Sequence, residues 1–109
     1  MLFNTTKNSL ITEEVLVCKS YFSKASGLMF RSKRNLVFLF DKEVKEPLHM
    51  FFVFYPIDVL FLDKDKKIVE IKRNFKSFTF YSPKNKAQYI IELAIDYSIN
   101  YNVGDQLEF

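Results

Sequence analysis

Residues 48–62 read LHMFFVFYPIDVLFL and form the most apolar run of the chain. Leu48 to Tyr55 carries apolar side chains at both alternating sets of positions, which is typical of a central strand with two covered faces. Pro56 has no N–H to donate, so it ends this strand, and a second strand resumes over Val59–Leu62. A membrane span needs about 20 apolar residues and rarely contains a carboxylate such as that of Asp58. We therefore predict two buried strands and no membrane segment.

Segments on both sides of this run have the length and the composition of further strands. We predict strands at residues 13–19, 36–40, 68–72, 78–80, 89–95 and 106–109. The clearest alternation is that of residues 89–95, which places Gln88 and Glu92 on the face opposite Ile91 and Leu93. Several short strands at regular spacing favour an antiparallel β domain.

Polar residues mark the connections between these strands. Asp63–Lys66 predicts a hairpin turn, and residues 41–46 predict a charged connection. Ser20 predicts the N-cap of a short helix over residues 21–26, which Gly27 ends. The fold class is therefore mainly β, or a β-rich α+β fold. We expect a compact single domain over residues 1–109, with a mostly antiparallel, barrel-like sheet and one or two short helices.

Size and cysteine content narrow the class of protein. The chain has 109 residues and a mass of 13.0 kDa, which corresponds to one domain. Its only cysteine, Cys18, excludes an internal disulfide, and one cysteine with one histidine excludes a Cys/His zinc cage. The first residues lack the basic and apolar stretches of a signal peptide. We therefore expect a cytoplasmic protein without a metal, a cofactor or a membrane contact.

Basic residues slightly outnumber acidic ones. The 16 Lys and Arg residues against 13 Asp and Glu give a net charge of +3 and a pI near 8.9. No block of five or six like charges occurs, so we read the excess as spread along the chain. This balance is weaker than the profile of a dedicated nucleic-acid binder, and it disfavours nucleic acid as the partner. We interpret the mild basicity as a solubility feature.

Three stretches carry a resemblance to a known family. They are Gly27-Leu28-Met29-Phe30-Arg31, then His49-Met50 with Pro56 to Asp63, and then Tyr89 to Leu93 with Val103 to Leu107. At these spacings the chain, from about Thr12 to Phe109, resembles domain-of-unknown-function family 192. Many bacterial members have the sequence Trp-Met-Lys-Asn-Thr where this chain has His49-Met50-Phe51-Phe52-Val53. The version with two phenylalanines looks like that of the archaeal branch. The resemblance implies a small β fold, a single domain and no assigned activity.

Four residues are candidates for a ligand site: Arg31, His49, Met50 and Asp58. Arg31 is followed within three positions by two further cations, a group that either holds a carboxylate or phosphate or belongs to a solvated loop. His49 is the only side chain that ordinarily titrates near neutral pH, although a lone histidine at a strand edge more often bonds to the backbone.

Asp58 lies inside an apolar run, where a carboxylate must be either paired or exposed. One interpretation is that its oxygens accept backbone N–H groups and stabilise the turn after Pro56. The other is that it contacts a ligand or transfers a proton. No nucleophile–base pair, glycine-rich phosphate loop or metal-ligand motif accompanies it. The sequence therefore favours a role other than catalysis.

The leading hypothesis is a non-enzymatic binding or accessory module. In it, Arg31, Met50 and Asp58 receive a small anionic ligand or the chain end of a protein partner. One alternative is a small hydrolase or isomerase that uses His49 and Asp58.

A second alternative is the binding of single-stranded nucleic acid. Residues 72–81 interleave aromatic side chains with Lys and Arg, a combination that suits base stacking and phosphate neutralisation. We expect Phe78 and Phe80 to be core residues, because the alternation assigns them to a buried face. Their burial would remove the stacking surface.

Overall fold

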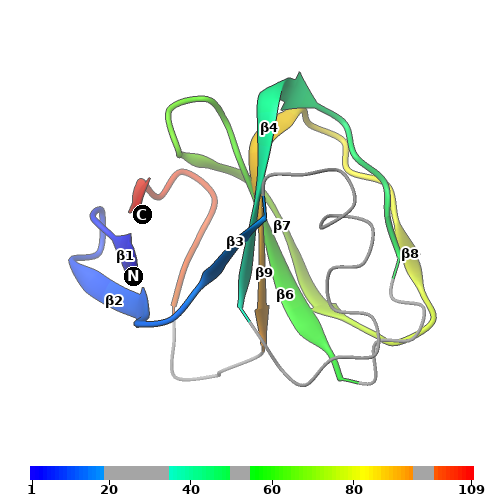
Figure 1. Ribbon diagram of the computed structural model, residues 1–109, viewed down its shortest axis with the longest axis horizontal. Helices are drawn as coiled ribbons and strands as arrows, with labels where there is room; N and C mark the ends of the chain where they lie inside the picture. Colours follow the sequence, from blue (N-terminus) through cyan, green and yellow to red (C-terminus); the bar gives the residue numbers. More distant parts are fainter. Residues whose placement is uncertain (19–34, 50–54, 95–99) are drawn as a thin grey trace.

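The computed structural model describes residues 1–18, 35–49, 55–94 and 100–109, and every regular element within these ranges is a β-strand (Figure 1). The strands are β1 (Leu2–Asn4), β2 (Ser9–Thr12), β3 (Leu16–Cys18), β4 (Leu36–Val44), β5 (Leu48–His49), β6 (Ile57–Leu62), β7 (Ile68–Phe75), β8 (Phe80–Tyr81), β9 (Ala87–Ala94) and β10 (Leu107–Glu108). The chain is therefore mainly β, as the regular spacing of its short apolar segments predicts. The short helix expected over residues 21–26 lies outside the described residues.

A five-stranded sheet forms the centre of the fold, in the order β3-β4-β9-β6-β7. Its neighbours pair antiparallel except β3 and β4, which run parallel. β6 pairs with β9 on one side and β7 on the other, and all six of its residues are buried. This is why the apolar run of the sequence lacks a polar face. Among the described strands the sheet is open, with β3 and β7 at its edges, so it does not close into a barrel.

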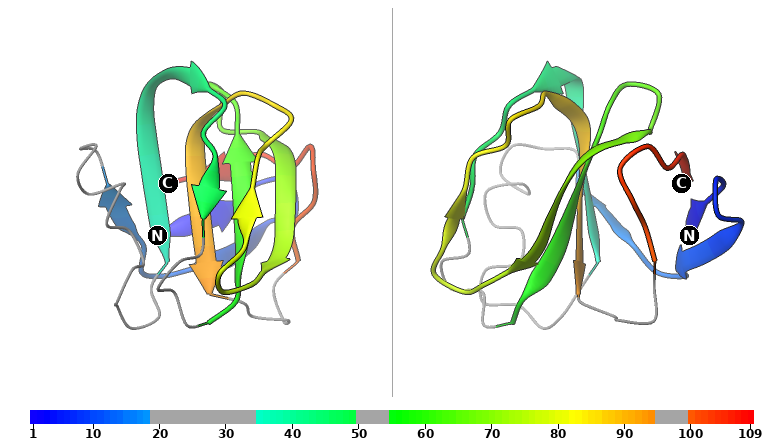
Figure 2. Two further views of the ribbon diagram at one scale, coloured as in Figure 1. Left: turned by 90° about the vertical axis from the view of Figure 1, so that its right-hand side faces the viewer. Right: turned by 180° about the vertical axis from the view of Figure 1, so that it is seen from behind.

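Each face of the central sheet is covered by a different small sheet (Figure 1). On one face lies the sheet β10-β1-β2, and we call the core between them the terminal-side core. Its buried residues include Leu2, Ile11, Leu60, Ile91, Leu93 and Tyr101. On the other face lies the two-stranded ribbon of β5 and β8, seen in front of the central sheet in the left view of Figure 2. We call the core on this face the ribbon-side core, and its buried residues include Leu36, Ile57, Val59, Phe61 and Ile90.

The predicted turn at Asp63–Lys66 is confirmed. Oδ1 of Asp63 accepts the backbone N–H groups of Asp65 and Lys67 at 2.9 and 3.0 Å. This Asx-type arrangement satisfies two donors of the turn without secondary structure, which explains why Asp suits its first position. The hairpin joins β6 to β7.

Other boundaries differ from the predictions. The charged connection expected over 41–46 is wrong for residues 41–44, because β4 continues through them and pairs Val44 with Ala87 beyond a register shift. Asp41 and Lys42 are exposed strand residues there, and an exposed strand tolerates charge. The strand expected from Leu48 to Tyr55 is described only at β5, since residues 50–54 lie outside the described residues. The predictions omitted β1 and β2.

Candidate functional site

Of the four candidate residues, His49 and Asp58 lie within the described residues. Arg31 and Met50 lie outside the described residues. His49 ends β5, where its register partner across the ribbon is Phe80 of β8. Asp58 is the second residue of β6 and is buried.

The Asp58 carboxylate joins three segments of the chain. Its Oδ1 accepts the backbone N–H of Asn74 at 2.8 Å, and its Oδ2 accepts the hydroxyl of Tyr101 at 2.6 Å. Oδ2 also lies 3.4 Å from Nη1 of Arg73, whose guanidinium lies over the Tyr101 ring at 4.9 Å from its centroid. Arg73 donates as well to the Tyr101 carbonyl oxygen. The N–H group that Asp58 accepts therefore comes from β7, whereas the sequence interpretation placed such donors in the turn after Pro56.

Asp58 and β5 lie on opposite sides of the central sheet. The register partner of Asp58 in β9 is Leu93, which belongs with Tyr101 to the terminal-side core. Leu48 of β5 packs against the ribbon-side core. Because the sheet separates these two cores, the arrangement does not favour a catalytic pair of His49 and Asp58, which needs contact directly or through one water.

Glu92 is a buried carboxyl group that the sequence analysis did not single out. It pairs with Leu36 on one side and Val59 on the other, and both neighbours belong to the ribbon-side core. Glu92 is 7% exposed, and burial raises the pKa of its carboxyl group to about 7. The alternation correctly placed Glu92 opposite Ile91 and Leu93. It did not reveal that both faces of β9 are covered.

Glu70 is buried in β7 and fixes the segment that follows β8. Its oxygens accept the Tyr81 hydroxyl and the backbone N–H groups of Lys84 and Asn85, the last two at 2.9 Å. Burial alone would raise the pKa of Glu70, but these hydrogen bonds outweigh it and hold the pKa below its usual value. Burial together with the Glu70 carboxylate raises the pKa of Tyr81 to about 12. The Glu70 carboxylate therefore links β7 to β8 and to the segment after it.

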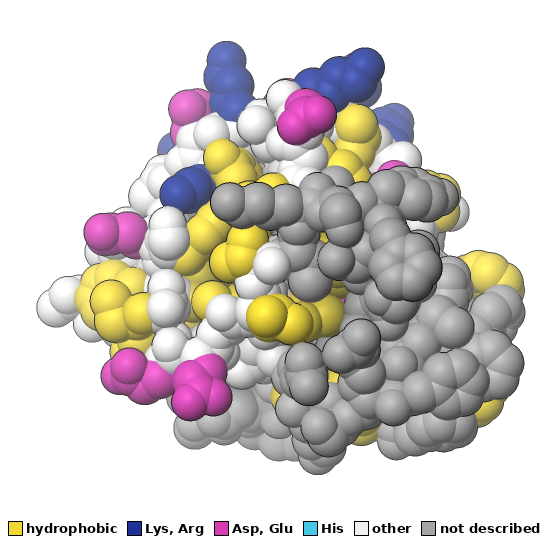
Figure 3. Space-filling model, viewed as in Figure 1, with side chains coloured by type: hydrophobic (Ala, Val, Ile, Leu, Met, Phe, Trp, Pro, Cys, Tyr) yellow, Lys and Arg dark blue, Asp and Glu magenta, His cyan; other side chains and the backbone are white. Residues whose placement is uncertain are grey.

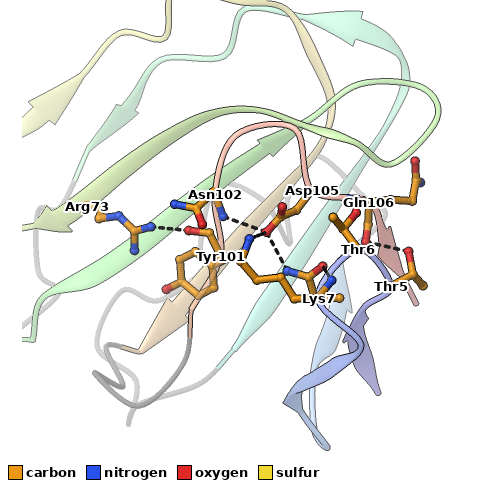
Figure 4. Close-up of polar contacts among 9 residues, drawn as sticks. Thr5, Thr6, Lys7, Arg73, Tyr101, Asn102, Asp105 and Gln106 are labelled. Carbon is orange, nitrogen blue, oxygen red and sulfur yellow. Dashed lines mark hydrogen bonds and ion pairs between the residues drawn. The ribbon is translucent and has the colours of Figure 1, made fainter.

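Asp105 is a third carboxylate that accepts several hydrogen bonds, and its donors lie near the two ends of the chain (Figure 4). Its Oδ2 accepts the ammonium of Lys7 at 2.7 Å, the amide of Asn4 at 2.8 Å and the backbone N–H of Asn102 at 2.9 Å. Burial alone would raise the pKa of Asp105, but the hydrogen bonds and the positive charge of Lys7 lower it. This carboxylate therefore joins the loop after β1 to the segment before β10.

Residues 72–86 are rich in positive charge, and we call them the cationic segment. It contains five of the 16 Lys and Arg residues and none of the 13 Asp and Glu, so it carries +5 while the remainder of the chain carries −2. Arg73 is committed to Asp58 and Tyr101. The four lysines left are Lys72, half-buried with its Nζ 5.5 Å from the Tyr81 ring centroid, and the exposed Lys76, Lys84 and Lys86. The prediction that the excess charge is spread along the chain was therefore wrong, because cations can be concentrated in a segment without forming an uninterrupted block.

Two aromatic rings of this segment are exposed. Phe78 is 55% exposed and Phe80 is 70% exposed, so the expectation that they are core residues was wrong. In β8 it is the next residue, Tyr81, that packs against the ribbon-side core. Hydrophobic side chains accordingly appear at the right-hand rim of Figure 3, where β8 lies in Figure 1. The segment thus combines exposed rings with positive charge.

The described ranges also lack two other kinds of feature. No described helix is long and apolar enough to cross a membrane. No group of three or more His, Cys, Asp or Glu side chains among these residues is placed to hold a metal ion.

Comparison with known proteins identifies relatives over the whole chain. The profile of the family DUF192, described as "Uncharacterized ACR", matches residues 2–109. A UPF0127 protein of Thermococcus sibiricus is 38% identical over all of this chain and 74% of its own. Another, from Pyrococcus horikoshii, is 35% identical over all of this chain and 98% of its own.

Two solved structures are similar in fold. One, from Sinorhizobium meliloti and described provisionally as a transcription regulator, has a TM-score of 0.86 at 21% identity, over 98% of this chain and 88% of its own. The other, a protein of unknown function from Novosphingobium aromaticivorans, has a TM-score of 0.79 at 19% identity, over 87% and 74%. At these identities the likeness concerns the fold alone.

Proposed function

Since the chain belongs to DUF192, an uncharacterised family with archaeal relatives, we propose from the geometry that it is a non-enzymatic binding module for an anionic partner. The binding surface in this proposal is the cationic segment, residues 72–86. The observation that carries the proposal is that this one segment holds five cations, no acid and two exposed phenylalanines.

The state of the buried carboxylates supports binding over catalysis. Those of Asp58 and Glu70 each accept hydrogen bonds from two other parts of the chain, and that of Asp105 accepts them from Asn4 and from Asn102 in its own turn. A carboxylate engaged in this way holds the fold together and has little capacity left to move a proton. We therefore assign these three residues to structure.

The charge distribution supports an anionic partner. The segment carries +5 in sequence, and although Asp58 pairs with Arg73 and the Glu70 carboxylate lies against Lys84, its four lysines still create a field that attracts anions. Lysines and exposed phenylalanines in the same segment also offer both an electrostatic and an apolar contact. A cytoplasmic location, expected from the unpaired Cys18, belongs to the same proposal. That Arg31, His49, Met50 and Asp58 bind a small anionic ligand or the chain end of a protein partner stays a separate prediction.

Two charge-reversal variants test the proposal with a simple polyanion, inorganic polyphosphate. Lys76→Glu with Lys84→Glu reverses charge on the cationic segment, whereas Lys42→Glu with Lys67→Glu reverses two exposed lysines elsewhere. Both variants change the net charge equally. We expect isothermal titration to show at least a roughly tenfold loss of affinity for the first variant only, because a local site loses its contacts. Equal losses in both variants would reduce the attraction to net charge and refute the site.

A further inference from the structure

We propose that the cationic segment binds single-stranded nucleic acid, with bases stacked on Phe78 and Phe80 and phosphates neutralised by the lysines around them. This inference rests on the proposed anion-binding function and names the class of its partner. It also reverses the expectation from net charge, because the local charge rather than the total meets the phosphates.

The exposed rings supply the first argument. Base stacking requires an aromatic side chain that a base can reach, and Phe78 and Phe80 are both more than half exposed as residues. One residue separates them, so their Cα atoms are at most about 7 Å apart. Two rings at this separation can serve neighbouring bases of an extended strand.

The backbone at Phe78 supplies the second argument. Phe78 has φ = +60°, a left-handed conformation that is a genuine outlier for a bulky residue. Such a conformation is strained, and strained residues of this kind cluster at ligand-binding sites. The turn that holds it is closed by the Thr79 hydroxyl, which donates to the Lys76 carbonyl oxygen. An apolar ring is therefore presented to solvent at an energetic cost.

The course of the chain supplies the third argument. After β8 the segment runs along the outside of the fold to the start of β9, as both views of Figure 2 show. Glu70 holds this stretch in place through the N–H groups of Lys84 and Asn85. The rings and the exposed lysines Lys76, Lys84 and Lys86 thus belong to one continuous surface segment, and a flexible strand can follow such a segment.

This combination favours single strands over the other polyanions. In a duplex the base faces are stacked on one another, so they could not stack on Phe78 and Phe80. An acidic peptide would satisfy the lysines but would leave the two ring faces without a flat, apolar group to stack on.

Three fluorescent ligands of about twelve nucleotides, within the usual site sizes, test the inference by anisotropy. They are oligo(dT), an abasic strand with the same phosphates, and a duplex; poly-glutamate serves as a protein-like competitor. We expect oligo(dT) to bind most tightly. Its log-affinity should fall with log-salt at a slope of about −3, as for four phosphate contacts.

Two variants and a control locate the site. Phe78→Ala with Phe80→Ala should weaken oligo(dT) binding at least roughly tenfold and leave abasic-strand binding nearly unchanged, because only the bases stack. Phe80→Tyr, which keeps a ring, should bind as the natural chain does. Val103→Ala, at another exposed apolar position, is the matched control and should have no effect. Circular dichroism checks that each variant folds.

The outcomes separate the two proposals. Equal affinity for oligo(dT) and the abasic strand would overturn base stacking but leave the anion-binding proposal intact. Preference for duplex or for poly-glutamate would overturn single-strand recognition in favour of another polyanion. Absence of binding to every ligand would overturn both.

Discussion

The hydroxyl of Tyr101 lies 2.6 Å from Oδ2 of Asp58, although 43 positions separate the two residues in the sequence. Tyr101 is almost completely buried in the terminal-side core. A buried tyrosine needs a partner for its hydroxyl, and a buried carboxylate needs donors. The pair satisfies both needs at once and attaches the segment before β10 to strand β6 of the central sheet.

The first prediction concerns this pair. Asp58→Ala should lower the free energy of unfolding by about 1–3 kcal/mol, because it leaves the Asn74 N–H and the Tyr101 hydroxyl without their acceptor. Asp58→Asn keeps one acceptor oxygen and should cost less. Urea-induced unfolding measures both, with Asp41→Ala at an exposed position as the control. An Asp58→Ala variant as stable as this control would contradict the structural role.

The second prediction concerns Glu92, whose folded pKa is raised from 4.5 to about 7. Below about pH 4.5 the carboxyl group is protonated in both states. As the pH rises from there to about 7, only the unfolded state releases the proton, so the folded state loses about 3 kcal/mol of stability. Above that range the loss is complete.

Glu92→Gln should therefore remove this pH dependence and make the protein more stable than the natural chain at about pH 8. Unfolding curves at several pH values measure the effect. Glu13→Gln, at an exposed position, is the control and should not alter the profile. A profile that keeps its shape in Glu92→Gln would show that another group causes it.

The third prediction concerns Asp105, whose folded pKa is lowered from 3.8. A lowered pKa means that the stabilisation is present above the unfolded value and disappears as the pH falls through the folded value. Asp105→Asn should thus cost about 1–3 kcal/mol at neutral pH, and the difference from the natural chain should shrink in acid below the unfolded value. Lys7→Met should behave in the same direction, since it removes the partner at 2.7 Å. A difference that stays constant down to about pH 2 would be inconsistent with this pairing.

The fourth prediction concerns Gly104, which has φ = +98° in the turn before β10. No other atom lies within 4 Å of the position that a Cβ would occupy there. Gly104→Ala should therefore cost only the conformational penalty, about 1–2 kcal/mol, without a steric clash. Thermal and urea unfolding measure it. A loss far beyond this range would mean that the added methyl group meets an obstacle.

Elements with local causes could be predicted from the amino-acid sequence. Asp63 at the start of a polar turn between two apolar runs predicts the β6–β7 hairpin, because its side chain accepts the N–H groups of the next residues. Continuous apolar character over Val59–Leu62 predicts a strand covered on both faces, as β6 is. The three family stretches likewise predicted the family that the comparisons show.

The tertiary structure alone decided which residues the molecule covers and which it presents. Alternation placed Glu92 on the correct face but wrongly assigned Phe80 to the core. A period of two distinguishes the two faces of a strand, but it does not say what covers either face. Glu92 is buried because the ribbon-side core covers its face, and Phe80 is exposed because its neighbour Tyr81 occupies the inner position in β8. The donors to Asp58 come from β7 and from Tyr101, both brought there by strand pairing and by packing of the terminal-side core. Contacts of this kind join residues far apart in the chain, so no local pattern contains them.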